Sequence, residues 1–158
     1  MTVTLAVVDA TLAPAVLRLR PLPAQERFAG RPSQTLPGAD EDPGREPVAV
    51  LHDGGPVGFF VFDRHERFAV LSGAPHTLGV RAFFVDADHQ GRGFGTAALC
   101  ALPGYVAERH PDNTHLALTV NVANPVALRA YASAGFRHTG RLDLTGAAGP
   151  QHVLALEL

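Results

Sequence analysis

The chain has 158 residues, of which 46% are hydrophobic and 18% charged, a composition typical of one globular domain and not of a disordered segment. Its formal net charge is −2, so it lacks the basic field that would favour nucleic acid or an anionic membrane. All 13 basic residues are arginine, which excludes lysine-dependent chemistry such as a Schiff base.

Cysteine content and hydropathy bear on the compartment. The single cysteine, Cys100, excludes an internal disulfide and a thiolate metal cluster, and its apolar neighbours predict a small buried residue. The sequence shows no charged-then-apolar N-terminal signal and no apolar run long enough to span a membrane. We therefore expect a cytoplasmic protein with no metal, no nucleic-acid partner and no membrane partner.

The first half of the chain alternates short strand patterns with helical ones. Thr11 is the expected N-cap of the first helix, and Asp53-Gly54-Gly55-Pro56 is a strong hairpin turn signal. In chain order the patterns predict a strand at 2–8, a helix at 11–19, a short helix within 21–30, a long loop at 31–47, and paired strands at 48–52 and 57–63.

The second half contains the clearest punctuation. One helix has Asn124 as its N-cap, Pro125 at its first position and Gly135 just past its end. Pro103 is expected to kink or break the helix before it. In chain order we predict a strand at 77–85, a helix from about 94 to 109, a strand at 115–120, a helix at 124–135, and strands at 136–144 and 151–158. This order predicts an α/β or α+β fold.

A glycine-rich segment joins the strand at 77–85 to the helix that follows. The spacing of Gly91, Gly93 and Gly95 differs from the dinucleotide-binding Gly-x-Gly-x-x-Gly, and no Walker ending follows. The backbone N–H groups of glycines at the start of a helix suit a phosphate or pyrophosphate, because no Cβ shields them. Arg92 could add a charged donor at the rim. The alternative is an ordinary turn that needs positive φ.

A second motif follows about thirty residues later. Asn124 and Tyr131 are seven residues apart, two helical turns, so they share a face of the predicted helix. A tyrosine at helical spacing is by itself an ordinary core residue. Here it has a polar neighbour on the same face and a phosphate loop in the same half of the chain.

Together the two motifs resemble the GNAT superfamily of acetyl-CoA-dependent N-acetyltransferases. The loop matches that signature at Gln90, Gly93 and Gly95, and the strong matches extend over Thr77–Phe136. The resemblance implies a single domain over residues 1–158 with an α/β (α+β) fold. Its mixed central sheet would have about seven strands, splayed between strands 4 and 5 and flanked by helices. The downstream block is matched at Asn124, Ala127, Tyr131, Gly135 and Phe136.

The resemblance also implies acetyl-CoA as co-substrate and gives residues their roles. Backbone groups of Phe83, Phe84 and Val85 would pair with the pantetheine arm, and one N–H there would polarise the thioester carbonyl. Asn124 would contact the arm, and Tyr131 would protonate the departing thiolate. The pyrophosphate would rest on the N–H groups of Gln90, Gly91, Arg92, Gly93, Phe94, Gly95 and Thr96.

The implied reaction is direct attack of a neutral amine on the thioester, with the oxyanion held by the backbone donor. Deprotonating an amine of pKa ~10 at pH 7 costs about 4 kcal/mol of free energy, so a base or a water chain that accepts the proton is needed. Many members carry a glutamate near Gly79 or Val80, and this chain has none there. Substitutes could be His76, Asp63, His65 or Glu66, among which the sequence selects none.

The acceptor is expected to be a small-molecule primary amine such as a polyamine. The acidic residues Asp40, Glu41 and Asp42 could attract a cationic amine, or they could simply be a solvated loop. Two alternatives stay open: acetylation of a protein N-terminus or side chain, and a non-catalytic acetyl-CoA-binding module. A homodimer is also left open.

Overall fold

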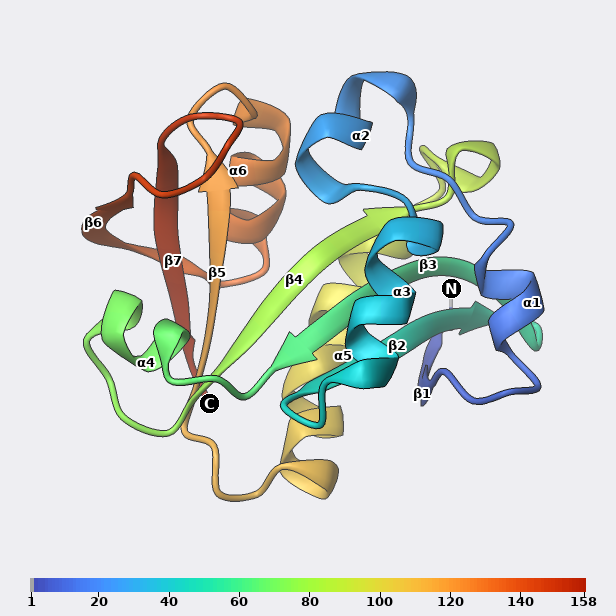
Figure 1. The fold of residues 1–158 in the computed structure, drawn as a ribbon, viewed down its shortest axis with the longest axis horizontal. Helices are drawn as coiled ribbons and strands as arrows, with labels where there is room; N and C mark the ends of the chain where they lie inside the picture. The colour runs from blue at the N-terminus through green and yellow to red at the C-terminus, as the bar shows by residue number, and fades with distance from the viewer. Residues whose placement is uncertain (1) are drawn as a thin grey trace. The chain divides into compact units, whose positions relative to one another are not determined.

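A computed structural model describes residues 2–158. Seven strands form one mixed sheet in the order β1-β2-β3-β4-β5-β7-β6, which confirms the predicted sheet (Figure 1). The strands are β1 (Thr4–Val7), β2 (Arg45–His52), β3 (Gly55–Asp63), β4 (Thr77–Val85), β5 (His115–Asn121), β6 (Arg137–Asp143) and β7 (Gln151–Glu157). The helices are α1 (Ala13–Val16), α2 (Pro23–Ala29), α3 (Pro32–Glu41), α4 (Arg67–Ser72), α5 (Phe94–Arg109) and α6 (Pro125–Ser133), with a 3-10 turn, η1, at Ala87–His89.

The sheet is mixed, with antiparallel pairs and one parallel pair between β4 and β5. β1 pairs with β2, and β7 pairs with both β5 and β6, in antiparallel register. The parallel register of β4 with β5 joins Thr77–Gly79 to His115–Ala117, although β4 continues to Val85 and β5 to Asn121. The pairing is thus confined to the beginnings of the two strands.

The chain divides into two compact units. The first comprises the residues up to Phe62 together with Arg81–Leu102, and the second comprises Asp63–Val80 together with Pro103–Leu158. Both β4 and α5 contribute to each unit. Organisation as a single domain over residues 1–158 stays a prediction.

In the first unit, α3 lies over one face of β2 and β3, and α5 lies behind them (Figure 1). The core under α1 and α3 consists of aliphatic and aromatic side chains. Every second residue of a strand contributes to it, because successive strand residues point to opposite faces of the sheet. Its buried members are Val8, Val16, Leu19, Leu36, Ala39, Ala49, Phe59, Val61 and Phe84.

In the second unit, α6 lies behind β5, and α4 packs against β5, β6 and β7 (Figure 1). Two arginines hold α4 in place. Arg67 on α4 forms an ion pair with the buried Asp143 of β6, and Arg141 of β6 donates from Nη1 to the Val70 carbonyl at 3.0 Å. The short helix α4 was not predicted from the sequence, because its six residues make less than two helical turns.

The segment 31–47 is a helix followed by a strand, and the prediction of a long loop was wrong. Pro32 occupies the first position of α3, where proline is favoured, and the Gln34 side chain accepts from the Arg31 N–H at 3.1 Å. Leu36 and Ala39 bury the inner face. The abundance of Pro, Gly and acidic residues concealed this short amphipathic pattern.

Two expectations for α5 were also wrong, a break at Pro103 and the burial of Cys100, whereas a kink at Pro103 stays a prediction. The helix runs unbroken from Phe94 to Arg109 with Pro103 inside it, and Cys100 is exposed. Leu102 and Val106 are fully buried on either side of the proline, and burial of this apolar face offsets the one lost hydrogen bond.

The structure confirms the predicted hairpin turn and the predicted ends of α6. Asp53 and Gly54 both have positive φ (51° and 80°), as a two-residue hairpin turn requires. Asn124 accepts from the Ala127 N–H at 3.3 Å as the N-cap of α6, and Gly135 follows the helix with φ of 100°. The first helix, in contrast, begins at Ala13, where Leu12 and not Thr11 is the N-cap residue.

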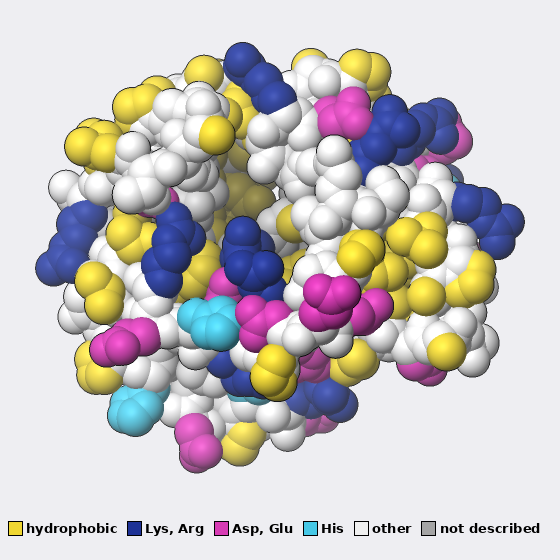
Figure 2. Space-filling view, viewed as in Figure 1, with side chains coloured by type: hydrophobic (Ala, Val, Ile, Leu, Met, Phe, Trp, Pro, Cys, Tyr) yellow, Lys and Arg dark blue, Asp and Glu magenta, His cyan; other side chains and the backbone are white. Residues whose placement is uncertain are grey.

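Arginine and acidic side chains stand side by side over the face drawn in Figure 2. Among residues 2–158, no helix is long and apolar enough to cross a membrane. The cytoplasmic location and the homodimer stay predictions.

Candidate active site

The glycine-rich loop lies in the first unit and leads into α5. Gly91 and Gly93 have φ of 74° and 84°, a left-handed conformation that glycine adopts without strain. The first helical hydrogen bond runs from Ala97 N–H to the Gly93 carbonyl at 3.0 Å. Within the described part of the chain, the backbone N–H groups of 90–96 donate to no protein acceptor. Unpaired donors at the positive end of a helix dipole suit an anion.

Side chains before the glycines fix the start of this loop. Gln90 donates from Nε2 to the Val85 carbonyl at 2.7 Å and so ties the loop to the end of β4. Asp86 is buried, and its carboxylate accepts from the Arg20 N–H at 3.0 Å and from His89 Nδ1 at 2.9 Å. The entrance of the loop is therefore held by side-chain bonds, while the glycines beyond it present bare backbone.

Nitrogen-containing side chains surround the ring of Phe94, the first residue of α5. The Arg92 guanidinium carbon lies 5.1 Å from the centre of the buried Phe94 ring. The rings of His52 and His89 lie at 4.9 Å and 6.0 Å from it. Arg92 thus makes a cation–π contact with Phe94, and its expected role as a charged donor stays a prediction.

The end of β4 carries Phe83, Phe84 and Val85. The Phe84 carbonyl faces β3, since a Cβ added to Gly58 would lie only 2.9 Å from that oxygen. Ala82 has φ of 55°, a conformation that turns the backbone groups of a strand and is uncommon for a residue with a Cβ. Sequence reasoning missed this irregularity, because alanine carries no signal for it.

Asn124 and Tyr131 lie on α6, in the second unit. The Asn124 side-chain oxygen is engaged in capping the helix. Tyr131 is half-buried, its ring lies 5.9 Å from that of Phe136, and burial raises the pKa of its hydroxyl above the ordinary value. A phenol is protonated in the neutral range even at its ordinary pKa, and burial strengthens that preference.

The two units thus carry different parts of the expected site. The first brings together the strand end, Gln90 and the glycines, and the second brings together Asn124 and Tyr131. The roles implied for these residues stay predictions.

The four suggested substitutes for the base differ in exposure. His65, Glu66 and His76 are exposed, whereas Asp63 is 3% exposed at the end of β3. Asp63 Oδ1 accepts from the His65 N–H at 2.8 Å. Burial separates Asp63 from the other three, but no base is assigned.

The position at which many members carry a glutamate is covered in this chain. Phe68 of α4 is 1% exposed, and its ring lies directly on Gly79 of β4. A Cβ on Gly79 would lie 2.2 Å from Phe68 Cδ2. The structure therefore supplies a physical reason for the missing side chain, which the sequence did not offer.

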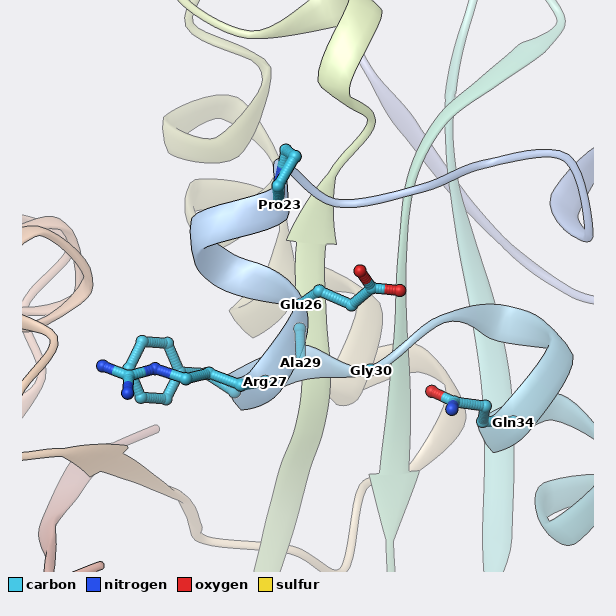
Figure 3. Close-up of a pocket in the computed structure, with 7 residues that line it drawn as sticks. Pro23, Glu26, Arg27, Ala29, Gly30 and Gln34 are labelled. Atoms are coloured by element: carbon cyan, nitrogen blue, oxygen red, sulfur yellow. The ribbon is translucent and has the colours of Figure 1, made fainter. Parts of the chain in front are cut away.

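A pocket of about 580 Å³ lies at the connection of α2 and α3 in the first unit (Figure 3). Glu26 and Gln34 point into the space between them, while Arg27 points away and lies over the Phe28 ring at 4.4 Å. The Glu26 carboxylate pairs with Arg31. Among residues 2–158, no three His, Cys, Asp or Glu side chains gather in a metal-binding arrangement.

Comparison with known proteins supplies the family. Residues 14–136 match the Acetyltransferase (GNAT) family. The chain is 33% identical over 130 residues to the uncharacterized N-acetyltransferase YbbJ of Bacillus subtilis (strain 168), covering 82% of this chain and 81% of that protein. It is 29% identical over 101 residues to the spermine/spermidine N(1)-acetyltransferase of the same strain, covering 64% of this chain and 65% of that protein.

The fold has close counterparts among solved structures. The aminoglycoside acetyltransferase AAC(6')-Ib, solved with parmomycin and acetyl-CoA, superposes with a TM-score of 0.74 at 19% identity. The superposition covers 99% of this chain and 94% of that one. The chain therefore belongs to the acetyltransferase (GNAT) family and is an N-acetyltransferase that uses acetyl-CoA as co-substrate.

Proposed function

We propose that the chain transfers the acetyl group of acetyl-CoA directly to a primary amine of a small molecule such as a polyamine. The observation that carries the proposal is the run of backbone N–H groups at 90–96 that have no acceptor within residues 2–158. These donors stand at the start of a 16-residue helix, where a pyrophosphate would replace the missing acceptors. Arg92 would contribute a charged donor at the rim.

The remaining residues would orient the thioester and manage protons. Backbone groups of Phe83 and the N–H of Val85, on the side of β4 away from the Phe84 carbonyl, would pair with the pantetheine arm. The amide of Asn124 would contact the same arm, because its oxygen caps α6 and its nitrogen is a donor. Tyr131, whose phenol is protonated at neutral pH, would donate its proton to the departing thiolate.

Two observations support a small cationic acceptor, the sequence similarity to a polyamine acetyltransferase and an acidic residue in a pocket. The likeness to a spermine/spermidine N(1)-acetyltransferase favours a polyamine. The pocket at α2 and α3 offers the Glu26 carboxylate, a group that suits an ammonium. Glu26 pairs with Arg31 on an exposed surface, and such pairs exchange partners at little cost.

The acidic residues 40–42 offer less support for substrate binding. Asp42 accepts from the Gly44 N–H at 2.8 Å and lies 3.7 Å from Arg45 Nε, so its carboxylate shapes the turn after α3. Asp40 and Glu41 are exposed at the end of that helix. The alternative acceptor, a protein N-terminus or side chain, would need an open groove.

The test is an acetylation assay with a panel of acceptors: spermine, spermidine, aminoglycosides, simple alkylamines, and peptides with free N-termini. Acetylated products are identified by mass spectrometry beside an acceptor-free reaction. We expect polyamines to raise turnover above hydrolysis. Acetylation of peptides alone would favour the protein acceptor. Thermal stabilisation by acetyl-CoA with no acceptor accepted would favour the non-catalytic module and refute the proposal.

A further inference from the structure

Asp86, which follows β4, is the most heavily bonded residue at the entrance of the glycine loop. It is 5% exposed, and each of its polar groups has a partner. Its N–H donates to the Val57 carbonyl at 2.8 Å, and its carbonyl accepts from the His89 N–H at 2.9 Å. Its side-chain oxygens divide between two other groups, the Arg20 N–H and His89 Nδ1.

Those bonds connect three parts of the first unit. Arg20 comes from the segment that leads into α2, Val57 from β3, and His89 from the turn immediately before Gln90. The Arg20 segment is also tied by the Ala87 N–H, which donates to the Arg20 carbonyl at 2.8 Å. The residue before the loop is thus fixed against both the sheet and a distant part of the chain.

Burying a carboxylate is costly unless hydrogen bonds satisfy it, so Asp86 needs all of these donors. The bond to Asp86 also orients His89, because the carboxylate is the partner of its ring nitrogen Nδ1. The loop that follows contains glycines, which have no side chains of their own to limit its conformations. Its N–H groups can converge on an anion only if their starting point is fixed.

We propose that Asp86 is a positioning residue for the phosphate-binding loop and acts through His89. This inference rests on the proposed function, since it assumes that the loop at 90–96 binds the phosphates of coenzyme A. His89 keeps Nδ1 toward Asp86 and packs its ring against Phe94, the first residue of the helix that presents the N–H groups. The carboxylate, the imidazole and the Phe94 ring thus form one continuous chain of contacts from the end of β4 to the first residue of α5.

The test compares two ligands that differ in phosphate. Dissociation constants for coenzyme A and for pantetheine, which lacks the nucleotide and pyrophosphate, are measured by calorimetry for wild type, Asp86→Ala and His89→Ala. We expect each variant to bind coenzyme A about tenfold or more weakly, with pantetheine affinity unchanged. The matched control is Asp88→Ala, an exposed neighbour whose carboxylate pairs with the exposed Arg20 side chain at 3.3 Å. It should match wild type.

A double variant tests the route through His89. If Asp86 acts through that side chain, the double variant Asp86→Ala/His89→Ala should lose no more coenzyme A affinity than the single variant with the larger loss. Additive losses, or equal losses for both ligands, would overturn the inference. Should Asp86→Ala fail to fold, the ligand comparison for His89→Ala decides the matter.

The failure of the underlying function is distinguishable. Wild type that binds pantetheine as tightly as coenzyme A would refute the phosphate loop itself. Wild type that prefers coenzyme A, with Asp86→Ala keeping that preference, would refute the positioning role alone.

Discussion

The contact between Phe68 and Gly79 predicts a strong energetic coupling between the two positions. A Cβ on Gly79 would lie 2.2 Å from Phe68 Cδ2 and 2.5 Å from Cε2 and Cγ, whereas ordinary contacts lie at 3.4–4 Å. The overlap thus exceeds 1 Å and falls on a ring that is 1% exposed. Because the ring is enclosed, it has little room to withdraw.

The magnitudes follow from that geometry. Gly79→Ala alone should destabilise the fold by about 2–3 kcal/mol through overpacking, and Phe68→Ala alone by about 3–5 kcal/mol through the cavity it leaves. In the Phe68→Ala background the methyl of Gly79→Ala enters empty space and replaces a glycine in a strand. It should then be neutral or stabilise by about 0.5–1 kcal/mol. The expected coupling is about 3 kcal/mol.

Urea unfolding of the wild type, both single variants and the double variant measures this coupling. For a domain of this size, a change of 1 kcal/mol corresponds to roughly 2–4 °C in Tm, so thermal unfolding gives an independent reading. The matched control is Gly104→Ala on α5, where a Cβ meets nothing within 4 Å and the helix should gain about 1 kcal/mol. Additivity within about 0.5 kcal/mol would refute the reasoning.

Three further outcomes are expected. Gly93→Asp should weaken coenzyme A binding roughly 100-fold relative to Gly93→Ala, which has the same strain at φ of 84° without the charge; equal affinities in calorimetry would contradict the phosphate loop. Tyr131→Phe should lower kcat about 100-fold with little change in acetyl-CoA affinity, and steady-state kinetics showing full activity would assign the proton to another donor. Burial alone would raise the pKa of Asp143, but hydrogen bonds from Thr145 and the charge of Arg67 outweigh it and leave the pKa below its ordinary value. Its contribution to stability is therefore present above pH about 4 and lost as the pH falls through the folded-state pKa. Asp143→Asn should cost about 1–3 kcal/mol at pH 7 and progressively less below pH 4 in urea unfolding, and a deficit independent of pH would contradict this.

Elements marked by local chemistry were predictable from the sequence. The hairpin turn needed two residues of positive φ and had Asp53-Gly54, and α6 had a cap, a proline and a terminal glycine. Such signals act over a few residues, so the sequence alone contains them. The family motifs at 90–96 and 124–136 are of the same local kind.

Features that depend on tertiary packing were not predictable. The helix α3 forms because Leu36 and Ala39 are buried against the sheet, and α5 tolerates Pro103 because Leu102 and Val106 are buried beside it. The short helix α4 is held by side chains of β6, a strand about seventy residues later in the chain. Composition read along a single segment contains none of this information.

In the candidate site, too, the local motif was predictable and the tertiary contacts were not. The residues of the loop were named from their motif, but the support from Asp86 and His89 and the left-handed Ala82 were not. The missing glutamate was noticed, whereas its physical reason, a ring from α4, appears only when distant residues meet. Contacts between residues far apart in the sequence leave no local pattern.

The exposure of Cys100 has a practical consequence. It is the chain's single thiol, on the solvent side of α5 and roughly 9 Å along the helix axis from Phe94. A maleimide dye would attach at this one position and report on ligand arrival at the nearby loop without any engineered cysteine. The same thiol would react with reagents that count released coenzyme A, so Cys100→Ser provides the clean background for colorimetric assays.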